Sequence, residues 1–206
     1  MKKTYLFTVS LFALFIFGCS EDDPQPINLE VQSEVNFEAP GDVYDYTTRP
    51  PSLIEEREFQ YYDFSTASEV TVNDDWDIGI KGTTIITNGG INGDGGVEAV
   101  TIPALFDDLN EVPSDASFSS DSQNALAINR NAGFENRWYS YANQIISPVP
   151  GRVILIKDTE GNYVKLEIQC YYRDCPTEPS PGQDNGVYTF RFVHQPDGST
   201  TFGQGA

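Results

Sequence analysis

Few residues of this chain could ligate a metal or act as nucleophiles. Its 206 residues include one histidine, His194, three cysteines and one methionine, Met1. A closed zinc site needs four His or Cys ligands, which the chain cannot supply if Cys19 is modified as argued below. The residues around His194 include neither a nucleophile elbow nor a neighbouring cysteine nucleophile, so a Ser-His-Asp or Cys-His centre is not indicated. We expect a protein that is not an enzyme.

Cys170, Cys175 and His194 all lie in the C-terminal third of the chain. Because the chain begins with an export signal, described below, we expect a short-range disulfide between Cys170 and Cys175 at the start of the polar loop 173–185. His194 has two interpretations. It is either a metal ligand at the rim of an apolar face or a strand-end residue just ahead of the turn 196–198.

The elements that would position these residues are β-strands. Three apolar runs, Val153–Ile156, Tyr163–Tyr172 and Val187–Gln195, are separated by polar segments, which predicts three consecutive antiparallel strands. In the last of them, alternation places Tyr188, Phe190, Phe192 and His194 on one face.

The rest of the chain is also predicted to be β-rich, because helical periodicity is nearly absent. Further strands are expected near 59–64, 76–80 and 83–87, which are rich in aromatic and β-branched residues. We expect 27–51 to be irregular, and the best helical candidate, 103–109, to make one or two turns. The prediction is a single antiparallel, all-β domain with one or two short helical turns.

Two sequence features that resemble ligand sites are given structural interpretations. The glycine-rich segment 88–96 is followed by neither Gly-Lys-Ser/Thr nor a helical pattern, so we interpret it as a flexible or tightly turning connection, not a phosphate loop. The acids Asp74, Asp75, Asp77 and Asp94 do not have the spacing of a twelve-residue calcium loop. We expect them to be solvated.

Aromatic residues cluster at Trp138, Tyr139 and Tyr141. Such a cluster is typical of core or interface packing, and the alternative is that these side chains stack on a ligand.

The N-terminus predicts export and lipidation. Lys2 and Lys3 precede an apolar run that ends at Gly18-Cys19, as in a signal peptide, and the run is shorter than the ~20 residues of a membrane-spanning helix. Ile16-Phe17-Gly18-Cys19 resembles a bacterial lipobox, which makes Cys19 the expected lipidation site. We therefore divide the chain into a signal peptide (1–18), a lipidated acidic tether (19–30) and a β domain (31–206).

The charge of the chain argues against nucleic acid as a partner. It has 31 acidic residues, 12 basic residues and a net charge of −19, whereas nucleic-acid binding depends on clustered Lys and Arg. The acidic residues 21–23 resemble the tether that directs lipoproteins of Bacteroidota to the cell surface. The expected location is therefore the outer membrane, with a lipid anchor and the domain exposed at the cell surface.

An ordered set of motifs extends from Phe59 to Phe202. It consists of Trp76-Asp-Ile, Thr87-Asn-Gly-Gly90, Trp138-Tyr-x-Tyr141 with Ile146-x-Pro148, Val153-Ile-Leu-Ile-Lys157, Asp158-x-x-Gly161-x-Tyr163-x-Lys165-Leu166, Tyr171-Tyr172, and Tyr188-Thr-Phe-Arg191 with Gln195-Pro-Asp-Gly198. This set resembles the HmuY family, haem-binding outer-membrane lipoproteins of Bacteroidota.

This resemblance implies an all-β fold with a haem pocket between loops at one end, and a haemophore that passes haem to an outer-membrane receptor. Known members hold the iron with two histidines or with methionines. This chain departs from that pattern, because Met1 is lost with the signal peptide and Gln144 stands near a position where many members have histidine.

Four possibilities for the ligand remain open. His194 could ligate the iron alone, Tyr139 or Tyr141 could do so as a tyrosinate, an apolar pocket could bind the porphyrin without strong iron coordination, or the chain could bind another hydrophobic ligand. We place ligand recognition around 138–148, at Trp138, Tyr139, Tyr141 and Gln144. The expected function is binding of haem or a related tetrapyrrole for uptake, and the alternative is a non-haem ligand-binding or adhesion module on the same scaffold.

Overall fold

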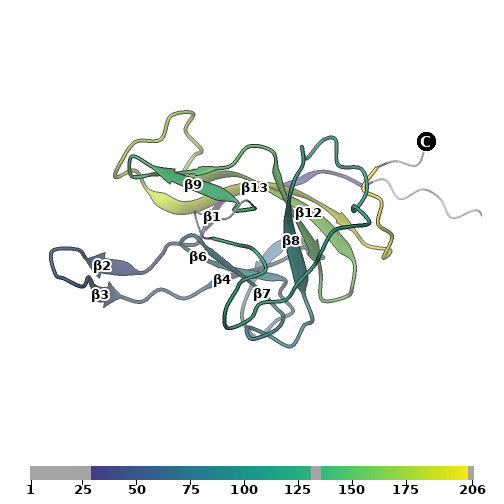
Figure 1. The fold of residues 1–206 in the computed structure, drawn as a ribbon, viewed down its shortest axis with the longest axis horizontal. Coiled ribbons are helices and arrows are strands. Elements are labelled where there is room, and N and C mark those ends of the chain that lie inside the picture. Colours follow the sequence, from purple (N-terminus) through teal and green to yellow (C-terminus); the bar gives the residue numbers. More distant parts are fainter. Residues whose placement is uncertain (1–28, 131–135, 204–206) are drawn as a thin grey trace, which may run out of the picture.

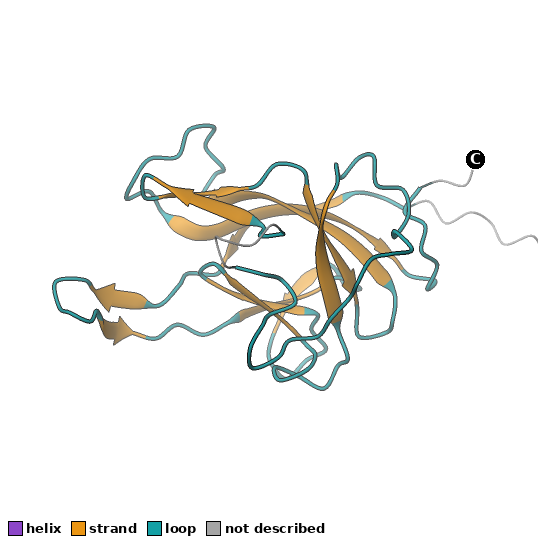
Figure 2. Ribbon diagram, viewed as in Figure 1, coloured by secondary structure: helices purple, strands orange, loops and turns teal. Residues whose placement is uncertain are grey.

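The structure, a computed structural model, describes residues 29–130 and 136–203. These residues form strands, turns and loops without a helix, as Figure 2 shows. No helix within these ranges could therefore cross a membrane. The all-β prediction is confirmed. The strands are β1 (Gln32–Glu38), β2 (Val43–Asp45), β3 (Ser52–Glu55), β4 (Gln60–Asp63), β5 (Ser68–Val70), β6 (Ile78–Lys81), β7 (Thr84–Thr87), β8 (Glu98–Pro103), β9 (Tyr139–Ala142), β10 (Ile145–Pro148), β11 (Arg152–Lys157), β12 (Tyr163–Tyr172) and β13 (Asn185–Gln195).

A five-stranded antiparallel sheet forms the centre of the fold, in the order β1-β13-β12-β11-β8 (Figure 1). The predicted meander is its core, since β11, β12 and β13 are neighbours, with Ile154 opposite Leu166 and Leu166 opposite Phe192. The predicted alternation is also confirmed, because Phe190 and Phe192 lie in one hydrophobic cluster and Val193 lies in another.

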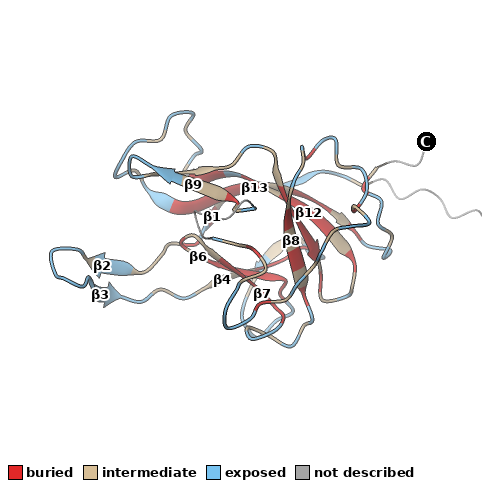
Figure 3. Ribbon diagram, viewed as in Figure 1, coloured by how far each residue is buried: buried red, intermediate tan, exposed pale blue. Residues whose placement is uncertain are grey.

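A second antiparallel sheet, β5-β4-β6-β7, packs on one face of the first. Aromatic rings join the two sheets, with centroids 5.2 Å apart for Tyr62 and Phe190 and 5.0 Å apart for Phe64 and Phe192. Such edge-to-face pairs add about 0.5–1.5 kcal/mol each beyond the area that they bury. The main core therefore lies between the sheets, as the buried strands of Figure 3 show.

The opposite face of the five-stranded sheet is covered by the segment after β8 and by the C-terminal residues. Phe106 and Phe202 pack there against Val153, Leu155 and Val193. The helical turns expected at 103–109 reduce to one turn, in which the Leu105 carbonyl accepts hydrogen bonds from the amides of Asp108 and Leu109. The Lys165 ammonium binds the carbonyls of Phe106 and Leu109 at this turn, both at 2.9 Å.

The expectation that 27–51 is irregular was wrong. β1 pairs with β13 along its length, and β2 pairs with β3. The register of β1 shifts between Val35 and Phe37, where Asn36 has a φ of 61°. This bulge interrupts the alternation of side chains on which sequence recognition of a strand depends.

The glycine-rich segment 88–96 is a tight turn, one of its two predicted structural interpretations. Gly90 has a φ of +64°, and a Cβ atom there would lie 1.9 Å from the Asp121 carbonyl oxygen. The Asn88 side chain closes the turn by donating to the Trp76 carbonyl at 2.8 Å and accepting from the Gly95 amide at 3.1 Å.

Candidate functional site

The β9–β10 hairpin carries the four residues predicted to bind a ligand. Trp138 immediately precedes β9, Tyr139 and Tyr141 lie on it, and Gln144 lies in the turn. Asn143 and Gln144 have φ values of 52° and 64°, as a two-residue hairpin turn requires. The structure therefore brings these four residues onto one small element.

The base of this hairpin is fixed by aromatic packing. Trp138 is 2% exposed, and its ring centroid lies 4.7 Å from that of Tyr139 and 5.7 Å from that of Tyr188. The Ile146 amide donates to the Tyr172 hydroxyl at 2.9 Å, which ties β10 to the end of β12. Trp138 thus belongs to the core, in agreement with the packing interpretation of the aromatic cluster.

The outer part of the hairpin is open to solvent. Tyr141 is 60% exposed, Gln144 is exposed and Tyr139 is half-buried. An exposed phenol ring on a hairpin held in place by its base can present a flat apolar face to a ligand without reorganising the core.

The β2–β3 hairpin extends from the same end of the molecule, at the left of Figure 1. It carries several exposed large apolar side chains, which are Val43, Tyr44, Tyr46, Leu53 and Ile54. A hairpin of such short strands is marginally stable alone, and exposed apolar groups concentrated on one element indicate a binding surface. This end of the molecule is therefore the candidate site.

His194 does not lie at this end. It is opposite Val164 near the start of β12, whereas the β9–β10 hairpin contacts Tyr172 at the end of that strand. Eight residues of extended strand correspond to about 25 Å. The predicted hairpin site and the predicted histidine ligand are therefore not brought together.

The surroundings of His194 favour its structural interpretation. Its Nε2 atom lies 2.8 Å from Asp158 Oδ2, and the two side chains are 9% and 1% exposed. Asp158 also accepts the amides of Glu160 and Asn162. Burial raises the pKa of Asp158, but these hydrogen bonds and the one from His194 outweigh it, so the pKa lies below its usual value. His194 thus helps to close the turn between β11 and β12.

Cys170 and Cys175 are both free thiols, the first buried and the second exposed. Burial, and then the hydrogen bond with Cys170, raise the pKa of Cys175 to about 12. Cys175 is therefore a neutral thiol at pH 7 and a poor thiolate ligand for iron. The disulfide between them stays a prediction.

The donors present decide how haem could be held. Across 29–130 and 136–203 no group of three or more His, Cys, Asp or Glu side chains could hold a metal ion. His194 is engaged by Asp158, which leaves Tyr139 and Tyr141 as the predicted donors at the candidate site. The residues fit a porphyrin held by its apolar faces and do not fit ligation by two histidines.

Asp77 is a buried residue that the sequence interpretation missed. It was expected to be solvated, but it is 1% exposed. Its carboxylate accepts the amides of Phe64 at 2.8 Å and Thr159 at 3.2 Å, so it joins the β4–β5 turn to the β11–β12 turn. Burial raises its pKa to about 6. No local signal distinguishes it from its exposed neighbours Asp74 and Asp75.

Comparison with solved structures finds similar chains at low identity. The apo HmuY analogue of Tannerella forsythia is 14% identical, with a TM-score of 0.45, over 86% of this chain and 100% of that chain. Apo PinO from Porphyromonas gingivitis is 14% identical, with a TM-score of 0.44, over 82% and 98%. A protein of Bacteroides vulgatus described as a candidate HmuY-like haem-binding protein is 14% identical, with a TM-score of 0.43, over 66% and 84%.

No curated protein matches the chain. A family model does match it: the model described as HmuY protein covers residues 55–192. The match contains both strands of the β9–β10 hairpin and the whole of β11 and β12. It covers more than half of the chain, and the chain therefore belongs to the HmuY family.

Proposed function

We propose that this protein is a surface lipoprotein that binds haem or a related tetrapyrrole at the end formed by the β2–β3 and β9–β10 hairpins, and passes it to an outer-membrane receptor for uptake. Membership of the HmuY family supports haem as the ligand. The observation that carries the location of the site is the gathering of exposed aromatic side chains, Tyr44, Tyr46 and Tyr141, on two hairpins at one end of the molecule.

The donor set shapes this proposal. The porphyrin would be held mainly by apolar contact and stacking, with a tyrosine oxygen as the available iron ligand at the hairpin. Because an exposed aromatic contact contributes about 1 kcal/mol, loss of one ring corresponds to a moderate loss of affinity.

The test is a haemin titration of the chain from Ser20 onward, followed by absorbance in the Soret region. We expect saturable binding without a bis-histidine spectrum. Tyr141→Ala should weaken binding about 2- to 10-fold, and Tyr141→Phe should separate the contribution of the ring from that of the hydroxyl. Tyr163→Phe, on the sheet away from the hairpins, is the matched control.

His194→Gln provides the second arm of this test. It should leave the Soret spectrum of the complex unchanged, because His194 lies at the other end of β12 from the hairpin. If the unmodified chain gave a histidine-type spectrum and His194→Gln did not, the haem site would lie at His194 and not at the hairpins. If the unmodified chain gave no saturable Soret change, the proposal would be overturned.

A second function, a non-haem ligand-binding or adhesion module, is favoured by one observation. Leu53 and Ile54 on the β2–β3 hairpin are exposed aliphatic residues, which suit contact with a protein surface as well as with a porphyrin. Failure of haemin binding, together with cell or matrix attachment that is lost on deleting residues 43–55, would select this function.

A further inference from the structure

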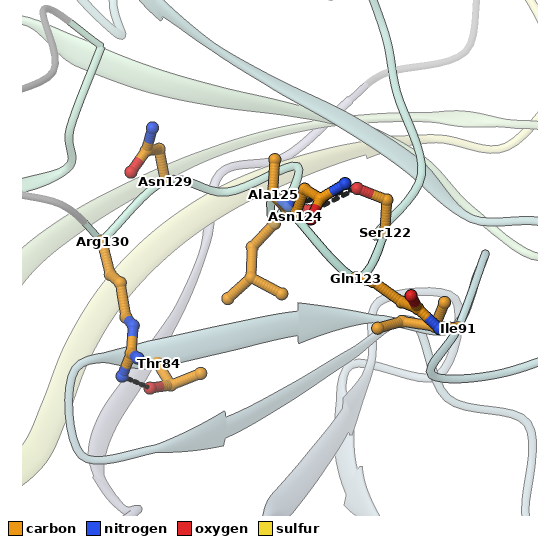
Figure 4. Close-up of a pocket in the computed structure, with 9 residues that line it drawn as sticks. Thr84, Ile91, Ser122, Gln123, Asn124, Ala125, Asn129 and Arg130 are labelled. Atoms are coloured by element: carbon orange, nitrogen blue, oxygen red, sulfur yellow. Dashed lines mark hydrogen bonds between the residues drawn. The ribbon is translucent and has the colours of Figure 1, made fainter.

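A cavity of about 330 Å³ lies between Thr84 at the start of β7, Ile91 of the glycine-rich turn and the loop 122–130. Figure 4 shows this cavity, with Thr84 on one side and Ser122, Asn124 and Ala125 on the other. Its volume is at the lower end of the range for small-molecule sites. The hairpins of the proposed haem site do not contribute residues to its lining.

The loop that lines this cavity is held in place by the buried carboxylate of Asp121. Asp121 is 2% exposed, and it accepts hydrogen bonds from the Thr87 amide at 2.8 Å, the Ala127 amide at 2.7 Å and the Asn92 side chain at 2.7 Å. Ile128, which belongs to the loop 122–130, is fully buried in the main core. The loop is thus fixed to β7 and to the glycine-rich turn, so the cavity is largely preformed and a ligand loses little binding energy in ordering it.

The lining has a different charge from most of this acidic protein. It contains the cation Arg130, the amides Gln123, Asn124 and Asn129, and no acidic residue, although the chain has 31 acids and 12 bases. The carboxylate of Asp121, beside the lining, is engaged by three N–H donors. The cavity is therefore a place where this surface can accept an anion.

Arg130 is held at the edge of the cavity. Its Nη1 atom donates to Thr84 Oγ1 at 2.8 Å, as the dashed line in Figure 4 marks. A guanidinium has five N–H donors in a planar fork that matches a carboxylate, and this contact with Thr84 engages one of them. The bond orients the side chain without neutralising its charge.

Apolar and amide groups complete the lining. Ile91, which is 57% exposed, and Leu126 both line the cavity, so an aliphatic group bound against Ile91 would cover surface that is otherwise exposed to water. The amides of Gln123 and Asn124 offer both donors and acceptors. The lining therefore combines a cation, amides and an aliphatic surface.

We propose that this cavity is a second binding site, for a small carboxylate that carries an aliphatic group and an amide, such as an N-acylated amino acid or a peptide C-terminus. Arg130 binds the carboxylate, the side-chain amides of the loop bind the amide of the ligand, and Ile91 with Leu126 contact its aliphatic group. The site does not depend on haem binding.

The test is a titration of the ¹⁵N-labelled chain from Ser20 onward with N-acetyl-L-leucine, followed by NMR. We expect saturable shifts of backbone amides in 84–92 and 122–130. The neutral analogue N-acetyl-L-leucinamide has the same body without the charge and should bind at least about 10-fold more weakly, because a hydrogen bond to a charged group contributes about 1.5–3 kcal/mol. Acetyl-Ala-Ala-Leu, compared with N-acetyl-leucine, distinguishes a peptide C-terminus from a free acylated amino acid.

Arg130→Gln should reduce the affinity for N-acetyl-L-leucine at least about 10-fold. It should leave the affinity for N-acetyl-L-leucinamide unchanged. Arg57→Gln, at a surface arginine paired with Glu55, is the matched control. Shifts that do not saturate, equal affinity for the acid and the amide, or full affinity in Arg130→Gln would each overturn the proposal. The comparison of acid with amide uses the unmodified chain, so it holds even if a variant folds poorly.

Discussion

Asp77 and Asp158 are neighbouring buried carboxyl groups whose environments shift their pKa values in opposite directions. Asp158 has the imidazole of His194 and two backbone amides as partners, and its pKa is lowered. Asp77 has two backbone amides and lies near the charge of Asp158; burial raises its pKa to about 6. Of the two, Asp77 is therefore the group that changes its charge in mildly acidic conditions.

The pH dependence of stability tests this difference at Asp77. The folded pKa of about 6 is above the ordinary aspartate pKa of 3.8, so its contribution to stability is complete below pH 3.8 and is lost as pH rises through about 6. Relative to Asp77→Asn, the unmodified chain should lose up to about 3 kcal/mol of unfolding free energy between pH 4 and pH 7. Urea unfolding at each pH measures this difference.

Asp74→Asn is the control for that experiment. The side-chain hydrogen bond from Thr71 lowers the pKa of Asp74, so its contribution is present at neutral pH and is lost as pH falls through its folded pKa. Between pH 4 and pH 7 the difference between the unmodified chain and Asp74→Asn should therefore stay nearly constant, because Asp74 changes its charge below pH 3.8. A flat difference between the unmodified chain and Asp77→Asn from pH 4 to 7 would contradict the assignment of Asp77.

Single residues of this chain were the least predictable from sequence. Asp77 was expected to be solvated because it stands next to exposed acids, and its partner Thr159 is far away in the chain. His194 was correctly placed on the aromatic face of its strand, but its contact with Asp158 depends on how β12 and β13 pair. A residue type and its neighbours carry no information about such distant partners.

At the level of elements, the glycine-rich turn shows how a loop with no regular structure positions its surroundings. Gly90 lies against the Asp121 backbone, and Asp121 in turn holds the loop 122–130. The turn is thus part of the scaffold of the Arg130 cavity, and Gly90 has a steric role in it.

Substitution of Gly90 tests this steric role. In Gly90→Ala the methyl group would meet the Asp121 carbonyl oxygen at a φ of +64°, and we expect a loss of about 3 kcal/mol or more. Gly96→Ala, in the same turn, has a φ of +72° but no atom within 4 Å of the added Cβ, so it should cost about 1 kcal/mol. Urea midpoints of the two variants measure the difference, and equal losses would show that backbone conformation alone decides the cost.

Strands were predictable where both faces are buried or where side chains alternate cleanly. β11, β12 and β13 satisfy these conditions and were found close to their predicted bounds. β1 was missed because it is largely exposed, has a bulge at Asn36 and owes its pairing to β13 at the other end of the chain. At 103–109 the expected one or two helical turns are a single hydrogen-bonded turn, and the carbonyls of Phe106 and Leu109 there bind Lys165, which lies on a distant strand.

At the scale of the whole molecule, the two candidate binding regions differ in chemistry. The end with the two hairpins presents exposed aromatic and aliphatic side chains, whereas the cavity at Arg130 presents a cation and amides in a protein of net charge −19. The first suits a flat hydrophobic molecule, and the second suits a small acid. Both belong to a domain that the N-terminal sequence predicts to be tethered to a membrane.

Membrane attachment is the prediction that belongs to the whole molecule. The signal peptide and tether lie mainly in residues 1–28, outside the part that the structure describes. In a bacterium that processes lipoproteins, the full chain should incorporate labelled palmitate and remain with the membrane fraction, because two or more acyl chains hold a soluble domain stably. Cys19→Ser should abolish both the label and the attachment, whereas Cys175→Ser, which removes an exposed thiol of the domain, should preserve them.

Label retained in Cys19→Ser would show that the anchor is elsewhere. A delipidated domain that still binds haemin would show that binding is a property of the β domain alone.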